Sequence, residues 1–221
     1  MIPGARLVLL GRQGAGKGTQ CARLSRHYVV PHISTGDMLR AAVREGTEFG
    51  RKAEEYMSAG ELLPDDIMVG IVDERLERDD TRARGFVLDG FPRTVAQAEA
   101  LLEITSPRGI NVVIDLEVPR EVVLARLASR RMCNDCGTNY SVDLPPKYDM
   151  VCDVCGGDVV QRDDDTEKAI AQRLALYDRE TEPLIEWFSG KGLLDVVDGT
   201  GHPDDVTDRL VRTIDRRREP R

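Results

Sequence analysis

Residues 11–19 read GRQGAGKGT and directly follow the largely apolar run ARLVLL of residues 5–10. A buried parallel strand that ends in glycines and leads into a helix is the setting that a phosphate-binding loop requires. Glycines allow successive N–H groups to converge on phosphate oxygens at the helix N-terminus, and Lys17 adds a positive charge. The hydroxyl of the usual motif arrives one residue late, in Thr19. A glycine-rich turn with a surface lysine is the alternative, but the coincidence of all these features predicts a nucleoside triphosphate site.

Similar apolar runs recur further along the chain, at residues 86–88, 112–116 and, more weakly, 193–197. Helical patterns lie between them. The clearest predicts a helix from about Asp164 to Phe188, kinked at Pro183, because apolar residues recur there at steps of three or four. Strands that alternate with helices predict an α/β fold with a doubly wound parallel sheet, whose ligands lie at the carboxyl ends of the strands.

Two stretches interrupt this alternation. Residues 34–63 predict short helices without a core strand, and residues 133–162 are rich in Cys, Gly, Asp and Pro. The basic run RRREPR at residues 216–221 is expected to be a frayed, solvated tail rather than a binding arm. The chain therefore combines one sheet domain with two insertions.

Length and charge limit the possible functions. With 221 residues, 41% of them hydrophobic, the chain is long enough for one core domain with small subdomains. A formal net charge of −8 makes general nucleic-acid binding unfavourable. The N-terminal apolar run lacks a basic leader and is too short to span a membrane, so we expect a soluble, unexported protein without a membrane partner.

The four cysteines of CNDC at residues 133–136 and CDVC at residues 152–155 form two knuckles separated by fifteen residues, a pattern typical of a tetrahedral zinc site. An insertion of about 30 residues buries too little apolar surface to fold alone, so structural Zn²⁺ would stabilise it. Paired disulfides are one alternative. A nucleic-acid contact is another, which the acidic residues of the same stretch oppose: Asp135, Asp149, Asp153 and Asp158. The remaining Cys21 is expected to be a small buried residue.

Several arginines need an explanation in such an acidic chain: Arg93, Arg126, Arg130, Arg162 and Arg173. Each alone could be a solvated surface charge. Together they suit phosphoryl transfer, in which positive donors hold two anionic groups in line. Arg126 and Arg130 are four residues apart, so on a helix they would share one face.

Five further motifs identify a family resemblance: GKGTQ at residues 16–20, STGDMLR at 34–40, DGFPRT at 89–94, RLASRR at 126–131 and QRDDD at 161–165. In order and spacing they resemble the adenylate kinases of the long-lid bacterial type, over nearly the whole chain. The resemblance implies a five-stranded sheet and three parts. These are a core of residues 1–33, 64–129 and 164–221, an AMP-binding segment of residues 34–63, and a zinc lid of residues 130–163.

The resemblance also implies roles for individual residues. Catalytic roles fall to Lys17, Arg93, Arg126, Arg130, Arg162 and Arg173. ATP contacts are expected from Gly14, Ala15, Gly16, Lys17, Gly18, Thr19, Arg126, Arg130, Asn139, Tyr140 and Gly201. AMP contacts are expected from Thr35, Arg40, Glu61, Leu62, Leu63, Gly90, Phe91, Pro92, Arg93, Gln97, Arg162 and Arg173. Mg²⁺ is expected to bind through water near Asp89 and Thr19, as a cofactor of ATP.

Some of these residues have simpler interpretations. Asp89 could merely cap a turn. Tyr140 could stack on adenine or fill the core of the lid. Asp164 and Asp165 are expected to cap the long helix and to form ion pairs that aim the arginines.

The implied reaction is reversible, Mg-dependent, in-line phosphoryl transfer, ATP + AMP = 2 ADP, in a closed arginine-rich cleft of a cytoplasmic monomer that maintains adenine nucleotides. Thr94, where similar pyrimidine monophosphate kinases carry asparagine, and Gln97 favour AMP as the acceptor. Another monophosphate acceptor or GTP as donor remains an alternative. A nucleotide-binding regulator with a zinc ribbon is an alternative from a different class of protein.

Overall fold

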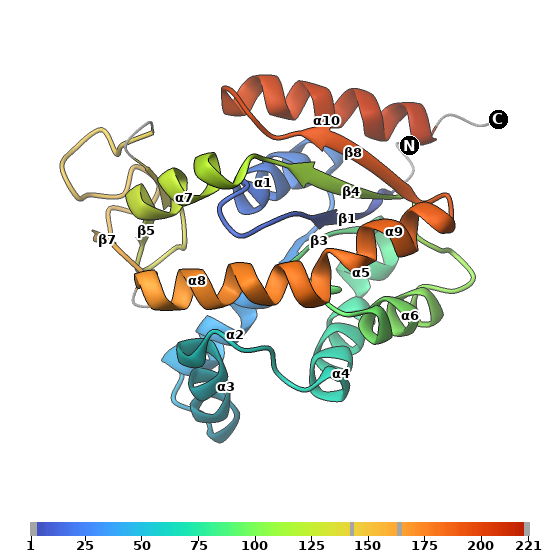
Figure 1. Ribbon diagram of the computed structural model, residues 1–221, viewed down its shortest axis with the longest axis horizontal. Helices are drawn as coiled ribbons and strands as arrows, with labels where there is room; N and C mark the ends of the chain where they lie inside the picture. The colour runs from blue at the N-terminus through green and yellow to red at the C-terminus, as the bar shows by residue number, and fades with distance from the viewer. Residues whose placement is uncertain (1–3, 142–143, 163–164, 219–221) are drawn as a thin grey trace.

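A five-stranded parallel sheet forms the centre of the computed structural model, which describes residues 4–141, 144–162 and 165–218 (Figure 1). The strand order is β2-β3-β1-β4-β8. The strands are β1 (Arg6–Leu10), β2 (His32–Ser34), β3 (Phe86–Asp89), β4 (Val112–Glu117) and β8 (Leu194–Asp198). This arrangement confirms the predicted doubly wound α/β fold with a phosphate loop after β1.

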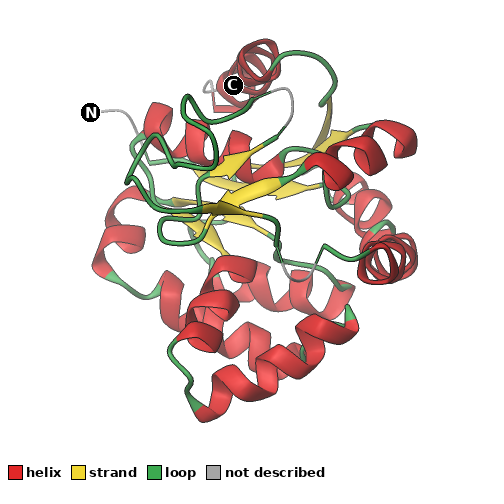
Figure 2. Ribbon diagram, turned by 90° about the vertical axis from the view of Figure 1, so that its left-hand side faces the viewer, coloured by secondary structure: helices red, strands yellow, loops and turns green. Residues whose placement is uncertain are grey.

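Helices cover both faces of the sheet (Figure 2). They are α1 (Lys17–Tyr28), α2 (Thr35–Arg44), α3 (Glu48–Ala59), α4 (Asp65–Leu76), α5 (Asp79–Arg84), α6 (Val95–Ile104), α7 (Arg120–Ser129), α8 (Glu167–Leu176), α9 (Pro183–Gly190) and α10 (Pro203–Arg218). Leu7 and Leu9 of β1 belong to the core cluster beneath α1 and α10, whereas Val8 and Leu10 belong to the opposite cluster. This alternation explains why a strand buried on both faces is continuously apolar. No helix in the described ranges is both long and apolar enough to cross a bilayer.

A second, smaller sheet is inserted between α7 and α8. Its antiparallel strands have the order β6-β5-β7 and are β5 (Arg131–Cys133), β6 (Asn139–Tyr140) and β7 (Val159–Val160). We call residues 131–160 the lid. It lies at one end of the molecule, and α2 and α3 extend from the core near it (Figure 1).

The fifth strand of the sheet is β2, at residues that the apolar pattern did not mark as a strand. Its three residues pair with β3, Ile33 opposite Leu88. Only the middle residue is fully buried. Three residues with polar ends carry too little periodicity to be recognised, so the strand depends on pairing with β3.

The predicted continuous helix from Asp164 is wrong in two respects. The N-cap of α8 is Thr166, which accepts a hydrogen bond from the Ala169 N–H at 3.2 Å, so Asp165 does not cap the helix as expected; Asp164 lies outside the described residues. The helix is also not simply kinked at Pro183. A π-helical turn, η1 (Tyr177–Thr181), joins α8 to α9, and the Glu182 N–H donates to the Tyr177 carbonyl at 2.9 Å. Pro183 has no N–H and cannot donate the hydrogen bond of a regular helical turn. The π-helical turn before it forms wider i→i−5 hydrogen bonds instead.

The expected frayed C-terminal tail is also wrong for its first three residues, which complete α10; residues 219–221 lie outside the described ranges. Arg217 forms an ion pair with Asp195 and donates to the carbonyls of Gly192 and Leu194, each at 2.9 Å. The Arg218 guanidinium lies 5.0 Å from the centre of the Tyr28 ring. These contacts fasten α10 to the edge of the sheet.

We predict that Arg217→Ala lowers the free energy of unfolding by about 1–2 kcal/mol, because it removes two backbone hydrogen bonds and an ion pair. Urea denaturation measures the change. Arg216→Ala is the matched control, since Arg216 is exposed and makes a single 3.4 Å contact with Thr213. Equal stability of both variants would contradict a docking role for Arg217.

Candidate functional site

The phosphate loop connects β1 to α1 through backbone angles that favour glycine. Gly11, Gly14 and Gly16 have φ values of 134°, 86° and 102°. A Cβ atom at Gly14 would lie 2.9 Å from the Val123 carbonyl oxygen. The loop therefore approaches α7 more closely than any side chain would permit.

Lys17 begins α1 and folds back over this loop. Its Nζ atom donates to the Gly11 carbonyl at 2.6 Å. Burial lowers the pKa of Lys17; the nearby carboxylate of Asp89 opposes that effect, and the positive charge of Arg93 adds to it. The ammonium group thus lies within a cluster of charges at the carboxyl ends of β1 and β3. Thr19 follows in the first turn of α1.

Three arginines converge next to this cluster. Arg93 follows β3, and its Nε atom donates to the Gly90 carbonyl at 2.8 Å. Burial lowers the pKa of Arg93; Asp89 opposes this, while the positive charges of Arg173 and Arg40 lower the pKa further. Guanidinium groups held together in this way repel one another. An anion bound between them would reduce that repulsion.

Arg130 and Arg173 are connected to the phosphate loop by an amide. With its oxygen facing the two guanidinium groups, Gln13 accepts hydrogen bonds from Arg130 Nη2 at 2.9 Å and Arg173 Nη1 at 3.1 Å. Arg130 Nε also donates to Asp165 at 2.7 Å, and the side chain of Asp165 is fully buried. The expected ion pair is therefore present. The role of Gln13 was not predicted, although a large amide in a loop of small residues was a signal for it.

Arg126 and Arg130 do not share a helix face, contrary to the sequence-based expectation. Helix α7 ends at Ser129, and Arg130 has the extended backbone angles φ −63° and ψ 135°. Arg126 donates to the Ala15 carbonyl at 3.0 Å and to the Gly199 carbonyl at 3.2 Å. The two arginines therefore reach the phosphate loop by different routes, Arg126 from the helix and Arg130 from the residue that joins the helix to the lid.

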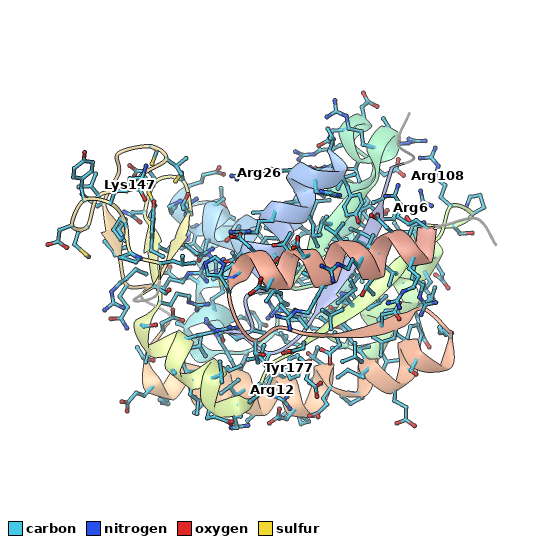
Figure 3. The ribbon with its side chains drawn as sticks, turned by 90° about the horizontal axis from the view of Figure 1, so that it is seen from above. Arg6, Arg12, Arg26, Arg108, Lys147 and Tyr177 are labelled. Atoms are coloured by element: carbon cyan, nitrogen blue, oxygen red, sulfur yellow. The ribbon has the colours of Figure 1, made fainter. Side chains whose placement is uncertain are left out.

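A further arginine in the loop, Arg12, contacts the π-helical turn. It donates to Asp178 at 3.1 Å, and its guanidinium lies 5.3 Å from the centre of the Tyr177 ring (Figure 3). The sequence pattern assigns no role to Arg12. Its partners are about 165 residues away in the chain, so no local pattern marks this contact.

The residues expected to recognise AMP lie around the end of β3. Gln97 is buried, donates to Asp65 at 2.7 Å and accepts from the Arg93 N–H at 2.8 Å. Thr35 is buried and donates to the Gly90 carbonyl at 2.9 Å. Both side chains are thus held by protein contacts, and a base would have to share or replace those of Gln97.

The other AMP candidates differ in exposure. Arg40 forms an ion pair with Asp37, and Arg173 donates to the Met57 carbonyl at 3.1 Å. Glu61 is exposed. The remaining members are at least partly buried: Leu62, Leu63, Phe91 and Pro92.

Asn139 of the lid approaches the phosphate loop. Arg162, which lies two residues after the lid, donates to the Asn139 amide oxygen at 2.9 Å. The Asn139 nitrogen lies 3.6 Å from the position that a Cβ atom of Gly18 would occupy. Gly201, in the loop before α10, has φ 92° and lies two residues after Gly199, whose carbonyl binds Arg126.

Tyr140 lies in the small core of the lid and is 8% exposed. Its hydroxyl donates to the Cys152 sulfur at 3.3 Å and accepts from the Asp153 N–H at 2.8 Å. This geometry supports the lid-core interpretation of Tyr140. Stacking of its ring on adenine would require the ring to leave these contacts.

The four lid cysteines fit a zinc ion. Their sulfur atoms lie within 4.8 Å of one another, with Cys133 and Cys155 at 3.4 Å and Cys136 and Cys152 at 3.5 Å. Tetrahedral Zn–S bonds of about 2.3 Å place sulfurs about 3.8 Å apart. All four are free thiols, so the alternative of paired disulfides is wrong.

Hydrogen bonds in the lid also favour a thiolate. Burial opposes ionisation of Cys152, but bonds from Tyr140 and from backbone N–H groups outweigh it and lower its pKa to about 6. Thiolates are the form of cysteine that binds zinc. Four cysteine ligands leave no open position for a catalytic water, so this metal would be structural.

Comparison of the chain with family models and comparison with individual proteins find the same family. The family model described as adenylate kinase matches residues 9–193. A relative named adenylate kinase from Archaeoglobus fulgidus is 53% identical over 88% of this chain and 90% of its own length. Relatives of the same name from Caldicellulosiruptor bescii and Methanosarcina barkeri are 48% and 50% identical, over 95% and 94% of this chain and 98% and 97% of their own lengths.

We predict that Cys152→Ser removes the bound zinc and lowers Tm, because the lid has too small an apolar core to fold without the metal. Each kcal/mol lost corresponds to about 2–4 °C in a chain of this size. Metal analysis and calorimetry measure both effects. Val154→Ser is the matched control, since Val154 lies in the same knuckle and is 67% exposed. A metal-free protein with unchanged Tm would refute a structural zinc.

Proposed function

The chain belongs to the adenylate kinase family, and from this premise we propose that it transfers the phosphoryl group by a magnesium-dependent, in-line reaction among the arginines described above. The family is one of nucleoside monophosphate kinases, which are phosphotransferases, and its reaction is ATP + AMP = 2 ADP. The observation that carries the finer proposal is the gathering of cations around Arg93: the charges of Arg173 and Arg40 lower the pKa of Arg93, whose own charge lowers that of Lys17. Phosphate groups bound among these cations would relieve the repulsion.

On the ATP side, the N–H groups of residues 14–19 and the Lys17 ammonium would hold the phosphates. Lys17 now donates to loop carbonyls, so a bound phosphate would compete for its Nζ atom. Arg126 contacts the same loop, and Arg130 faces it through Gln13. We assign Asn139 and Gly201 to the edge of this site and do not assign an adenine-stacking role to Tyr140.

On the AMP side, Arg40, Arg93 and Arg173 would hold the acceptor phosphate, and Arg162 would join them as the lid closes. The mobile parts that we propose are an AMP-binding segment of residues 34–63 and a lid of residues 130–163 on the remaining core. Closure would exclude water, which would otherwise accept the phosphoryl group. The Arg130–Asp165 pair lies at the proposed boundary and would guide that motion.

Gln97 would position the acceptor mainly by holding neighbouring protein groups in place, and less by touching the base itself. Its amide joins the Arg93 backbone to Asp65. Asp65 also accepts from the Thr94 hydroxyl at 2.9 Å. Thr94 and Gln97 therefore act as a pair that fixes the start of α6, and we propose that this surface accepts adenine.

Asp89 and Thr19 would hold magnesium-bound water. Burial opposes ionisation of Asp89, but His32, Lys17 and Arg93 lie close enough to outweigh it and lower its pKa. A carboxylate and a hydroxyl are the hard oxygen donors that Mg²⁺ accepts while keeping several waters. Bound with ATP, the ion would neutralise charge on the phosphate oxygens.

We further propose that the protein acts as a cytoplasmic monomer that balances ATP, ADP and AMP, without membrane or nucleic-acid partners. The net charge of −8 supports the absence of a nucleic-acid partner. Another nucleoside monophosphate as acceptor, or GTP as donor, would react by the same mechanism. A regulator that only binds ATP would not need arginines on both sides of the reaction.

The first test measures ADP formation from ATP and Mg²⁺ with AMP, CMP, UMP or GMP as the acceptor, beside a control without acceptor. We expect rapid ADP production with AMP alone. Turnover with a pyrimidine monophosphate alone would keep the mechanism and overturn the interpretation of Thr94 and Gln97. The absence of transfer to every acceptor would contradict the proposed function.

Lys17→Met should lower kcat by at least about 100-fold and leave Tm nearly unchanged, because one pre-oriented cation that stabilises the transition state is lost. Steady-state kinetics with AMP measure the effect. Lys168→Met is the control, since Lys168 is exposed on α8. A near-normal rate for the Lys17 variant would exclude Lys17 from catalysis.

A further inference from the structure

A second group of metal-ligating side chains lies behind the phosphate loop, apart from the lid. It comprises Cys21 of α1, His32 of β2 and Asp89 of β3. One ligand atom from each lies within 4.8 Å of the other two. The consecutive elements α1 and β2 and the distant strand β3 thus bring a thiol, an imidazole and a carboxylate together.

The sheet register explains why these residues meet. His32 pairs with Val87, and Asp89 lies two residues further along β3. Side chains two residues apart in a strand share a face, so His32 and Asp89 point to the same side as Val87. Val87 and Cys21 belong to one core cluster, which places the thiol of α1 over that side of the sheet.

His32 has an unsatisfied nitrogen at this position. Its Nε2 atom is buried and has no hydrogen-bond partner among the described residues. The nearest carboxylate oxygen, Asp89 Oδ2, is 3.7 Å away, which is too far for a hydrogen bond. Buried nitrogens without partners are uncommon in folded proteins, and a ligand would satisfy this one.

We propose that Cys21, His32 and Asp89 form a second metal site, which takes a thiophilic divalent cation such as Zn²⁺ or Cd²⁺ and inhibits phosphoryl transfer when it is filled. The donor set selects the cation. Sulfur and nitrogen favour Zn²⁺ and its heavier relatives over Mg²⁺, which prefers oxygen. Water would provide the fourth ligand.

The geometry requires only a modest adjustment. Zinc bonds of about 2.0–2.3 Å place ligand atoms roughly 3.3–3.8 Å apart, so no pair within 4.8 Å has to close by more than about 1.5 Å. Side-chain rotation can supply this, because the side chains of His32 and Asp89 are 22% and 14% exposed. Cys21 is fully buried, so the cation would enter past the other two ligands. As the metal–sulfur bond forms, the thiol proton passes to solvent.

Neighbouring charge makes this site weaker than the lid. The ammonium of Lys17 acts on both Cys21 and Asp89, and it would repel an entering cation. The lid offers four cysteine sulfurs to the cation, whereas the second site offers one. The lid would therefore fill first, and the second site would fill at higher free metal concentration.

Inhibition follows from the role of Asp89, and this part of the inference rests on the proposed function. A carboxylate bound to Zn²⁺ or Cd²⁺ no longer holds magnesium-bound water beside ATP. The new positive charge would also lie next to Lys17. Binding of the metal itself does not depend on the proposed function, so a binding measurement tests it separately.

The experiment titrates the zinc-loaded protein with Cd²⁺ and records thiolate-to-cadmium charge-transfer absorption, bound metal per chain and ADP formation. We expect one additional ion per chain in the wild type. Cys21→Ala should weaken binding of this ion by at least about tenfold and raise the half-inhibitory Cd²⁺ concentration equally, while leaving the activity measured with Mg²⁺ and without Cd²⁺ unchanged. Cd²⁺ also replaces zinc in the lid. This replacement occurs in the wild type and in Cys21→Ala alike, so it cancels when the two titrations are subtracted.

Loss of the buried thiol could disturb α1, so His32→Gln is included as a second variant. It is expected to bind the additional ion as weakly as Cys21→Ala does. His27→Gln is the matched control, because His27 is an exposed histidine of α1. Equal absorption and equal inhibition in the wild type, Cys21→Ala and His32→Gln would overturn the second site. Cadmium bound at Cys21 without loss of activity would overturn only the inhibitory role.

Discussion

Mutual repulsion among the cations around the phosphate loop constrains the rest of this structure. Arg93 lies close enough to Lys17 and to Arg173 for their charges to interact, although the chain as a whole is acidic. Such an arrangement does not stabilise the folded state by itself, because like charges are held together out of water. It persists because backbone carbonyls and a few acidic or amide groups hold each cation. Gln13 and Asp165 perform this task for Arg130.

The sheet supplies the rigid frame for these charges. Parallel strands end at one edge, so the loop after β1 and the residues after β3 are brought together without long connections. Gly14 allows the loop to contact α7 closely, and that helix carries Arg126 back to the Ala15 carbonyl. Packing of apolar residues on both faces thus fixes polar groups to within hydrogen-bonding distance. The small lid lacks such a core and relies on its four cysteines.

Asp89 stands where two kinds of chemistry meet. Its charge raises the pKa of both Lys17 and Arg93, and one of its oxygens lies within 4.8 Å of ligand atoms of His32 and Cys21. A hard cation with bound water suits the first environment, whereas a thiophilic cation suits the second. The same carboxylate could therefore serve the reaction or be withdrawn from it. Which state prevails depends on the metal available.

The sequence by itself determined the features that short-range spacing encodes. Residues 11–19 predicted the phosphate loop, apolar runs predicted four of the five strands, and two cysteine knuckles predicted a tetrahedral metal site, because each pattern lies within a few residues. Tertiary structure alone decided the rest. The pairing that creates β2, the contact of Arg12 with Asp178 and the cluster of Cys21, His32 and Asp89 join residues far apart in the chain. Their energies arise only when the sheet brings them together, so no local pattern could reveal them.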